Sequence, residues 1–164
     1  MNVRPATVED VSLIFSFIEK KSEFDRNLGA FSGVLRVSED KIRKTLFGKV
    51  PFAYVLFVEN NGREIGFALY GFRYSSFAGQ PSIWLDDLFV EENSRGRGAG
   101  LILMNYLAKI ALEYDCTHLA RICGCSKCSR IEFLLSFGCR NYGKTRKSLF
   151  FEMGSILENL ISKI

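Results

Sequence analysis

A glycine-rich loop, Arg95-Gly-Arg-Gly-Ala-Gly100, has the composition of a phosphate-binding site. It follows the apolar stretch Ile83–Val90 and precedes an amphipathic one, so we expect it to join a strand to a helix N-terminus. Such a terminus presents unpaired N–H groups and partial positive charge, and glycines let the backbone approach a phosphate closely. Arg95 and Arg97 can add charge-assisted hydrogen bonds. The sequence therefore predicts a pyrophosphate cradle.

Two adjacent carboxylates, Asp86 and Asp87, lie on the strand that leads into this loop. Neighbouring strand residues point to opposite faces, so only one of the two is expected to face a site. A carboxylate placed there is able to attract a cation and to accept a proton from it. The alternative is a pair of carboxylates at a strand end with no part in catalysis.

Cysteine and histidine side chains form the next candidate group, in Cys116-Thr-His118 and Cys123-Gly-Cys125-Ser-Lys-Cys128. Thiolates and an imidazole at such spacings are able to ligate zinc. However, Cys116–Cys123 has the composition of one strand, whose alternate residues face apart. We therefore interpret the cysteines as buried small apolar side chains, interpret His118 as structural, and predict no metal.

Apolar periodicity and turn signals predict the elements that hold these groups. The predicted strands are Asn2–Pro5, Pro51–Val58, Glu64–Tyr74, Ser82–Val90, Cys116–Cys123 and Ser148–Met153. The predicted helices are one opening at Thr7, then Ser38–Leu46, Arg95–Tyr114, Ser129–Phe137 and a short helix or tail at Ile156–Ile164. A hairpin turn is expected at Asn60–Arg63. This order predicts an α/β (α+β) fold with a mixed sheet, antiparallel in its middle.

Composition limits the class of protein. A chain of 164 residues with 48% hydrophobic residues is expected to form a single domain over 1–164. No apolar run reaches the ~18 residues of a membrane span, and the first residues lack a signal-peptide pattern, so we expect a cytoplasmic protein. The net charge of +4 does not favour nucleic acid, and the basic residues after Gly138 are interpreted as a solvated rim.

A Rossmann dinucleotide site is the competing interpretation of the loop, and three features exclude it. The spacing G-x-G-x-x-G breaks because Leu101 stands where the third glycine is required. No acidic residue follows a second parallel strand, and the strands before the loop form a meander.

The loop instead matches the Arg/Gln-x-x-Gly-x-Gly/Ala signature of the GNAT acyl-CoA N-acyltransferases. The order of elements resembles that superfamily up to about Gly138. The resemblance extends to the branch of polyamine (diamine) and thialysine N-acetyltransferases. The segments that resemble this branch are Val3–Thr7, Phe24-Asp25, Ile65–Tyr70 and Trp84–Val90.

This resemblance implies the GNAT fold, a mixed and mostly antiparallel sheet flanked by helices, with a splay between the fourth and fifth strands. It implies acetyl-CoA as cosubstrate and a homodimer. The implied cofactor-binding residues are Leu88, Phe89 and Val90 for the pantetheine arm, Arg95, Gly96, Arg97, Gly98, Ala99, Gly100 and Leu101 for the pyrophosphate, and Lys127. The implied substrate-binding residues are Phe24, Asp25, Trp84 and Asp86. Asp86 stands where the branch carries an acid that contacts the amine, so the resemblance implies that Asp86 attracts the cationic amine and accepts its proton, with Asp87 in a supporting role.

The chain departs from the superfamily where the thiolate leaving group is protonated. Leu134 stands at the position of the usual tyrosine and cannot donate a proton. Another donor such as Tyr142, Ser129, Cys125 or Cys128 can serve, or water can. Arg146 stands near the place of a second substrate-binding acid of the branch, which disfavours a long polycation as acceptor. A smaller amine, or one bearing a carboxylate, fits better.

The sequence thus predicts transfer of an acetyl group from acetyl-CoA to the primary amine of a small molecule, namely a diamine, thialysine or an amino-acid-like acceptor. Direct attack in a ternary complex is expected. The alternative is a weakly active or inactive domain of the same fold that binds acyl-CoA in a regulatory role. Neither a nucleic acid nor a membrane is expected as partner.

Overall fold

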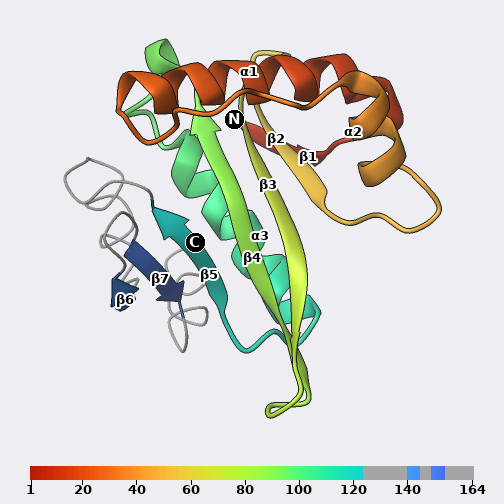
Figure 1. The fold of residues 1–164 in the computed structure, drawn as a ribbon, viewed down its shortest axis with the longest axis vertical. Helices are drawn as coiled ribbons and strands as arrows, with labels where there is room; N and C mark the ends of the chain where they lie inside the picture. Colours follow the sequence, from red (N-terminus) through yellow and green to blue (C-terminus); the bar gives the residue numbers. More distant parts are fainter. Residues whose placement is uncertain (124–139, 145–148, 154–164) are drawn as a thin grey trace. The chain divides into compact units, whose positions relative to one another are not determined.

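The computed structural model describes residues 1–123, 140–144 and 149–153 (Figure 1). Contacts divide the chain into two compact units. One unit comprises Met1–Tyr70 with Asp87–Leu103, and the other comprises Gly71–Asp86 with Met104–Ile164. That residues 1–164 form a single domain stays a prediction.

The first unit combines two helices with one edge of a sheet. Its strands neighbour one another in the order β1-β2-β3-β4, with β1/β2 and β2/β3 antiparallel. Its elements are β1 (Asn2–Pro5), a 3-10 turn (Val8–Asp10), α1 (Val11–Asn27), α2 (Glu39–Leu46), β2 (Tyr54–Asn60), and parts of β3 (Arg63–Ser75), β4 (Gln80–Val90) and α3 (Ala99–Glu113). Helix α1 crosses over the strands of this unit (Figure 1).

Phenylalanine rings form the centre of the first unit. The ring of Phe17 on α1 lies 5.6 Å from that of Phe57 on β2 and 5.5 Å from that of Phe67 on β3. Phe89 near the end of β4 joins them at 6.3 Å from Phe17. Aromatic rings at such separations stabilise a core beyond the effect of the area they bury. This cluster therefore fixes α1 against the last residues of β4.

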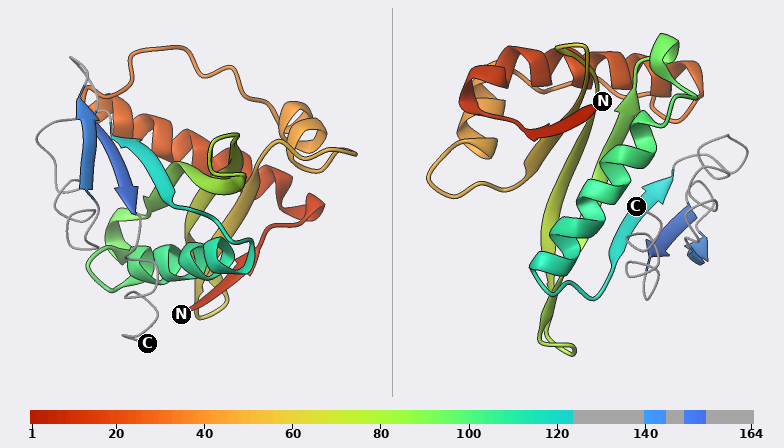
Figure 2. Two further views of the ribbon diagram at one scale, coloured as in Figure 1. Left: turned by 90° about the horizontal axis from the view of Figure 1, so that it is seen from below. Right: turned by 180° about the vertical axis from the view of Figure 1, so that it is seen from behind.

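The second unit contains the rest of β3, β4 and α3 with β5 (Leu119–Cys123), β6 (Arg140–Lys144) and β7 (Leu149–Met153). The strands neighbour in the order β3-β4-β5-β7-β6 (Figure 2). Strands β4 and β5 are parallel and pair at Ile83↔Leu119 and Trp84↔Ala120, whereas β4 itself continues to Val90. Pairing that stops before both strands end is what the predicted splay requires. The predicted fold class, a mixed and mostly antiparallel sheet, is confirmed.

Local signals placed several boundaries correctly. Asn61 and Gly62 adopt φ of 52° and 74° between β2 and β3, as the predicted two-residue hairpin turn requires. Ser38 caps α2 by accepting a hydrogen bond from Lys41 N at 3.3 Å. The predicted turn is therefore confirmed, and the helix predicted over Ser38–Leu46 is α2, which begins directly after Ser38.

Other boundaries differ from the prediction. The helix expected from Arg95 begins at Ala99, because Gly96 and Gly98 adopt positive φ values that a helix does not allow. The strand expected from Cys116 begins at Leu119, since Cys116 N still donates to Ala111 O at the end of α3. Strand β6 was not predicted. The predicted helices at 129–137 and 156–164 lie outside the described residues.

None of the described helices is both long enough and apolar enough to cross a bilayer.

Arg4 on β1 joins three carboxylates of the first unit. Its guanidinium donates to both oxygens of Asp10 at 2.7 and 2.8 Å, to Glu59 at 2.7 Å, and to Glu64. The bond from Arg4 lowers the pKa of Asp10 from 3.8 to about 2. A group whose pKa is lowered by folding stabilises the protein above its unfolded pKa and loses that contribution as the pH falls.

We therefore expect Asp10→Asn to lower the free energy of unfolding at pH 7 by about 1–2 kcal/mol. The difference from the wild type should shrink between pH 4 and pH 2, where Asp10 of the wild type becomes protonated. Urea denaturation at pH 7 and pH 3 measures both values. Glu23→Gln, at an exposed position of α1, is the control. A difference that is the same at both pH values would contradict the assignment.

Candidate functional site

The end of β4 is held tightly against β3 and α1. Glu91 N donates to Ile65 O at 2.9 Å, and the Glu91 carboxylate pairs with Lys20 and Arg63, each at 2.6 Å. Phe89 is buried, while Leu88 and Val90 are half-buried. The end of the strand that the sequence assigns to a pantetheine arm is thus held by contacts with β3 and α1.

Gly66 on β3 allows the close approach of β4. A Cβ at Gly66 would lie 2.6 Å from the carbonyl oxygen of Phe89 and 3.1 Å from a methyl group of Val90. The first distance is far below van der Waals contact with a backbone atom that has no alternative rotamer. Only glycine fits there without moving β4.

We expect Gly66→Ala to displace the end of β4, lowering the free energy of unfolding by about 1–3 kcal/mol and weakening acetyl-CoA binding. Thermal unfolding with and without acetyl-CoA measures both effects. Gly29→Ala is the control for donor binding: alanine at φ of 66° also strains the backbone and lowers stability, whereas its Cβ meets no described atom within 4 Å. If both variants bind acetyl-CoA equally well, the position of this strand does not matter for the donor.

The glycine-rich loop passes directly into α3. Gly96 and Gly98 adopt φ of 73° and 85°, and a Cβ at either position would meet no described heavy atom within 4 Å. The first bond of the helix runs from Ile102 N to Gly98 O at 3.0 Å, so the amides of residues 99–101 precede the helical ladder. The loop therefore offers amides beside open space, an arrangement suited to an anion.

Arg95 connects the loop to α1 and β4. Its Nε donates to Val90 O at 2.8 Å, and its guanidinium carbon lies 4.2 Å from the ring centroid of Phe24. The same group lies 5.6 Å from the ring of Phe89. The side chain of Arg95 is therefore engaged by protein groups, and its contribution to the loop includes holding it in place. Arg97 is exposed.

Lys21 on α1 bridges two carboxylates in the first unit. Its Nζ lies 2.5 Å from Asp25 Oδ2 and 2.6 Å from Asp87 Oδ1. The three side chains are only 14%, 13% and 21% exposed, in the order Lys21, Asp25, Asp87. Sequence reasoning missed Lys21, although its spacing of four residues from Asp25 on a helix was a visible signal.

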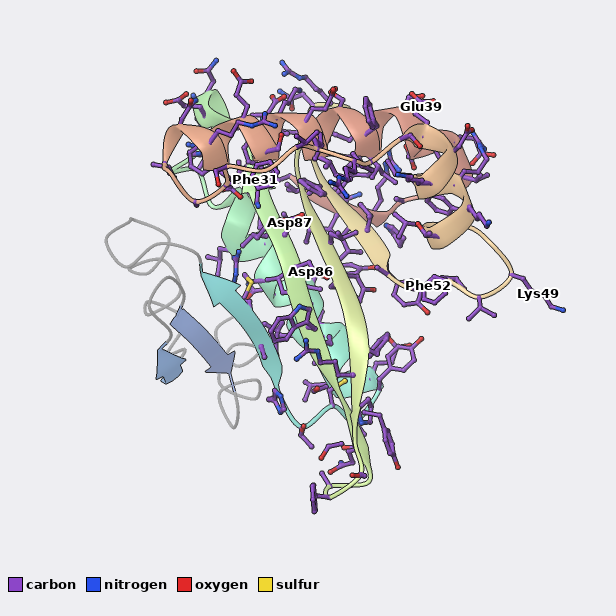
Figure 3. The ribbon with its side chains drawn as sticks, in the orientation of Figure 1. Phe31, Glu39, Lys49, Phe52, Asp86 and Asp87 are labelled. Atoms are coloured by element: carbon purple, nitrogen blue, oxygen red, sulfur yellow. The ribbon has the colours of Figure 1, made fainter. Side chains whose placement is uncertain are left out.

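Asp86 and Asp87 are adjacent on β4 (Figure 3). Their side chains contact different neighbours. In the second unit, Trp84 Nε1 donates to Asp86 Oδ1 at 2.9 Å, and Asp86 is exposed. The guanidinium carbon of Arg73 lies 3.5 Å from the ring centroid of Trp84. This row of side chains orients the Asp86 carboxylate, and Arg73 is a second residue that the sequence did not single out.

The predicted site residues fall into three groups. Phe24, Asp25 and the donor segment 88–101 lie in the first unit, and Trp84 and Asp86 lie in the second. The remaining candidates, Lys127, Leu134, Arg146, Ser129, Cys125 and Cys128, lie outside the described residues, as does the side chain of Tyr142.

Cys116 and His118 are the cysteine and histidine whose side chains the structure describes. Cys116 is buried, and burial raises the pKa of its thiol. A ring nitrogen of His118 lies 2.8 Å from the Thr117 hydroxyl. Within the part of the chain that the structure describes, no three His, Cys, Asp or Glu side chains gather as a metal site would require.

Comparison with known proteins adds independent evidence. The sequence profile of a family described as acetyltransferase (GNAT) matches residues 24–138. The chain is 29% identical over 125 residues to thialysine N-epsilon-acetyltransferase of Bos taurus, an alignment covering 71% of each protein. It is 28% identical over 123 residues to the Mus musculus protein of that name, covering 70% of this chain and 69% of the relative.

Among solved structures, a ribosomal-protein-alanine N-acetyltransferase from Brucella melitensis has a similar fold, with a TM-score of 0.71 and 21% sequence identity. The match covers 94% of this chain and 99% of that one.

Proposed function

Because the chain belongs to the acetyltransferase (GNAT) family and is an acetyl-transferring enzyme, we propose that it transfers the acetyl group of acetyl-CoA to a primary amine. The acceptor is a small molecule of the diamine, thialysine or amino-acid-like class. The observation that carries the proposal is the glycine-rich loop at the end of β4, whose two positive-φ glycines leave open space before the amides of α3.

The donor half of the proposal uses backbone groups. The amides of residues 99–101 and the partial positive charge of the helix N-terminus bind the pyrophosphate. Gly96 and Gly98 allow it to come close, while Arg95 keeps the loop against Val90 and Phe24. Arg97 and Lys127 add positive charge. The backbone of Leu88, Phe89 and Val90 pairs with the pantetheine arm as an added strand would.

The acceptor half assigns the chemistry to Asp86, with Trp84, Phe24 and Asp25 binding the substrate. An alkylamine is mostly protonated near neutral pH and must lose a proton before it attacks. Asp86 attracts the ammonium and accepts that proton, directly or through water, while Trp84 holds the carboxylate in one orientation. The amine nitrogen then bonds to the acetyl carbon as the carbon–sulfur bond breaks, and the thiolate leaves as CoA.

The proton for the thiolate has more than one available source. Leu134 cannot provide it, whereas Tyr142, Ser129, Cys125, Cys128 and water can. Loss of a positioned general acid lowers a rate by about 10²–10⁴-fold and does not abolish it. The proposal therefore does not require a tyrosine at position 134.

A two-part experiment tests the proposal. Acetyl-CoA is expected to raise the melting temperature, and release of free thiol is then measured with a panel of primary amines. Binding without release on any amine would favour the alternative, a regulatory domain that binds acyl-CoA. No stabilisation by acetyl-CoA would contradict both.

We extend the proposal to a homodimer in the cytoplasm. The resemblance to the polyamine and thialysine branch supports the homodimer. Light scattering of the purified protein tests the oligomeric state.

A further inference from the structure

We propose that Arg95 makes binding of the pantetheine arm depend on the pyrophosphate, so that the enzyme selects acetyl thioesters of CoA over those of pantetheine without a pyrophosphate. The guanidinium covers the backbone carbonyl of Val90 and leaves it for phosphate oxygens. This inference rests on the proposed function and narrows its donor class. The observation behind it is the hydrogen bond from Arg95 Nε to Val90 O, at 2.8 Å.

The Val90 carbonyl points to the edge of β4 that faces away from β3. Glu91 N donates to Ile65 O on β3 at 2.9 Å, and the peptide bond between Val90 and Glu91 is trans. Because the C=O and N–H of a planar trans peptide point in opposite directions, Val90 O lies on the other edge. The pairing of β5 with β4, as far as the structure describes β5, ends at Trp84. An arm that adds to β4 as a strand would therefore use the edge that carries Val90 O.

Arg95 occupies the place of a strand donor on this edge. An N–H group of an added strand would bond to Val90 O at about 2.9 Å, and Arg95 Nε bonds to it at 2.8 Å. The guanidinium carbon lies 4.2 Å from the ring centroid of Phe24 and 5.6 Å from that of Phe89. Contacts of a cation with aromatic rings at these distances favour this position of the side chain. The arm and the Arg95 side chain therefore compete for the same stretch of edge.

Phosphate oxygens are stronger partners for Arg95 than a backbone carbonyl is. Arg95 is exposed and directly precedes Gly96 in the loop assigned to the pyrophosphate. A guanidinium binds phosphate through charge-assisted and often bidentate hydrogen bonds, whereas a carbonyl is neutral. A donor with a pyrophosphate would thus uncover Val90 O as it binds, but a donor without one would have to displace Arg95 unaided. Arg95 is therefore a specificity-determining residue for the donor.

Two simpler roles of Arg95 predict different results. If Arg95 only holds the loop in place, its loss weakens the binding of every donor. If it only contacts phosphate, its loss weakens the binding of acetyl-CoA and leaves that of acetyl-pantetheine unchanged. If it covers Val90 O, its loss has opposite effects on the two donors, because acetyl-CoA loses a partner and acetyl-pantetheine loses a competitor.

The test measures the dissociation constants of acetyl-CoA and acetyl-pantetheine by calorimetry and, for weak binding, by ligand-observed NMR. The wild type is compared with Arg95→Met, which keeps an unbranched side chain and removes the charge and the N–H donors. We expect Arg95→Met to bind acetyl-pantetheine about three- to tenfold more tightly and acetyl-CoA about tenfold more weakly. The control is Arg97→Met, at an exposed position of the same loop, which should weaken the binding of acetyl-CoA without changing that of acetyl-pantetheine.

A second variant keeps the charge of Arg95. Phe24→Leu removes the nearer aromatic ring, so the guanidinium should cover Val90 O less often. Acetyl-pantetheine should then bind more tightly, whereas acetyl-CoA should keep most of its affinity because Arg95 is still present. If Arg95→Met does not fold, Phe24→Leu decides the question by the same comparison.

The outcomes separate this inference from the proposed function. Binding of acetyl-pantetheine by Arg95→Met that is unchanged, weaker or undetectable would overturn the proposal for Arg95. If the wild type binds acetyl-CoA but transfers no acetyl group to any amine, the proposed function fails, whereas the dissociation constants still decide this inference.

Discussion

Replacing Asp86 with Asn is expected to lower kcat/KM for the amine by about 10²–10⁴-fold, the range for loss of a positioned proton acceptor. Asparagine has nearly the shape of aspartate and can still accept a hydrogen bond from Trp84 Nε1, so the local geometry should persist. What is lost is the negative charge that attracts the ammonium and the basic oxygen that takes its proton. Steady-state release of free thiol measures the effect.

The donor half provides the control for this variant. The proposed donor segment runs from Leu88 to Leu101, so Asp86→Asn should leave stabilisation by acetyl-CoA unchanged. Glu113→Gln, which alters an exposed carboxylate at the end of α3, should leave turnover unchanged as well. Undiminished turnover in Asp86→Asn would remove Asp86 from the mechanism.

Trp84→Phe is expected to lower turnover by less than Asp86→Asn does. The variant keeps an aromatic ring near Arg73 but removes the Nε1–H that donates to Asp86 at 2.9 Å. The carboxylate keeps its charge and loses one constraint on its orientation, so the loss should be smaller than for Asp86→Asn. Both variants would report on the same carboxylate, one through its charge and the other through its position.

Local sequence patterns predicted most of the helices and strands, because turns and helix ends depend on interactions between residues that are close in the sequence. The Asn61-Gly62 turn requires positive φ at both residues, and few other pairs adopt it readily. Ser38 before α2 is recognisable because a hydroxyl there satisfies an amide of the first helical turn. Strand β6 gave no such signal, since Arg140–Lys144 has neither alternation nor an apolar run, and its pairing with β7 depends on tertiary structure.

The sequence predicts the part of the candidate site that requires an unusual backbone conformation. It does not predict contacts between side chains that are far apart in the sequence. Gly96 and Gly98 identify the loop in the sequence, because glycine readily adopts positive φ angles and leaves room for an approaching ligand. Lys21 is different. From sequence, its pair with Asp25 resembles an ordinary surface contact of a helix, and only the fold brings Asp87 to the same ammonium. The side chain of Arg95 likewise bonds to Val90 O and packs over the ring of Phe24, and its motif specifies neither contact.

The second large effect is expected from Gly98→Ala, which should weaken acetyl-CoA binding by about 10- to 100-fold. Alanine at φ of 85° introduces backbone strain of about 1–2 kcal/mol. The methyl group itself meets no described atom of the protein within 4 Å. The space it enters is the space we assign to the pyrophosphate, so its main cost should appear only when the donor is present.

Gly79→Ala separates strain from obstruction. Gly79 lies in the turn between β3 and β4 with φ of 67°, and a Cβ there also meets no described atom within 4 Å. Both variants should therefore lose similar stability without ligand, as chemical denaturation would measure. Titration with acetyl-CoA should then reveal a large loss of affinity in Gly98→Ala and little in Gly79→Ala. Equal affinities in the two variants would mean that the open space beside Gly98 does not receive the phosphates, and the donor site would have to be sought elsewhere on the chain.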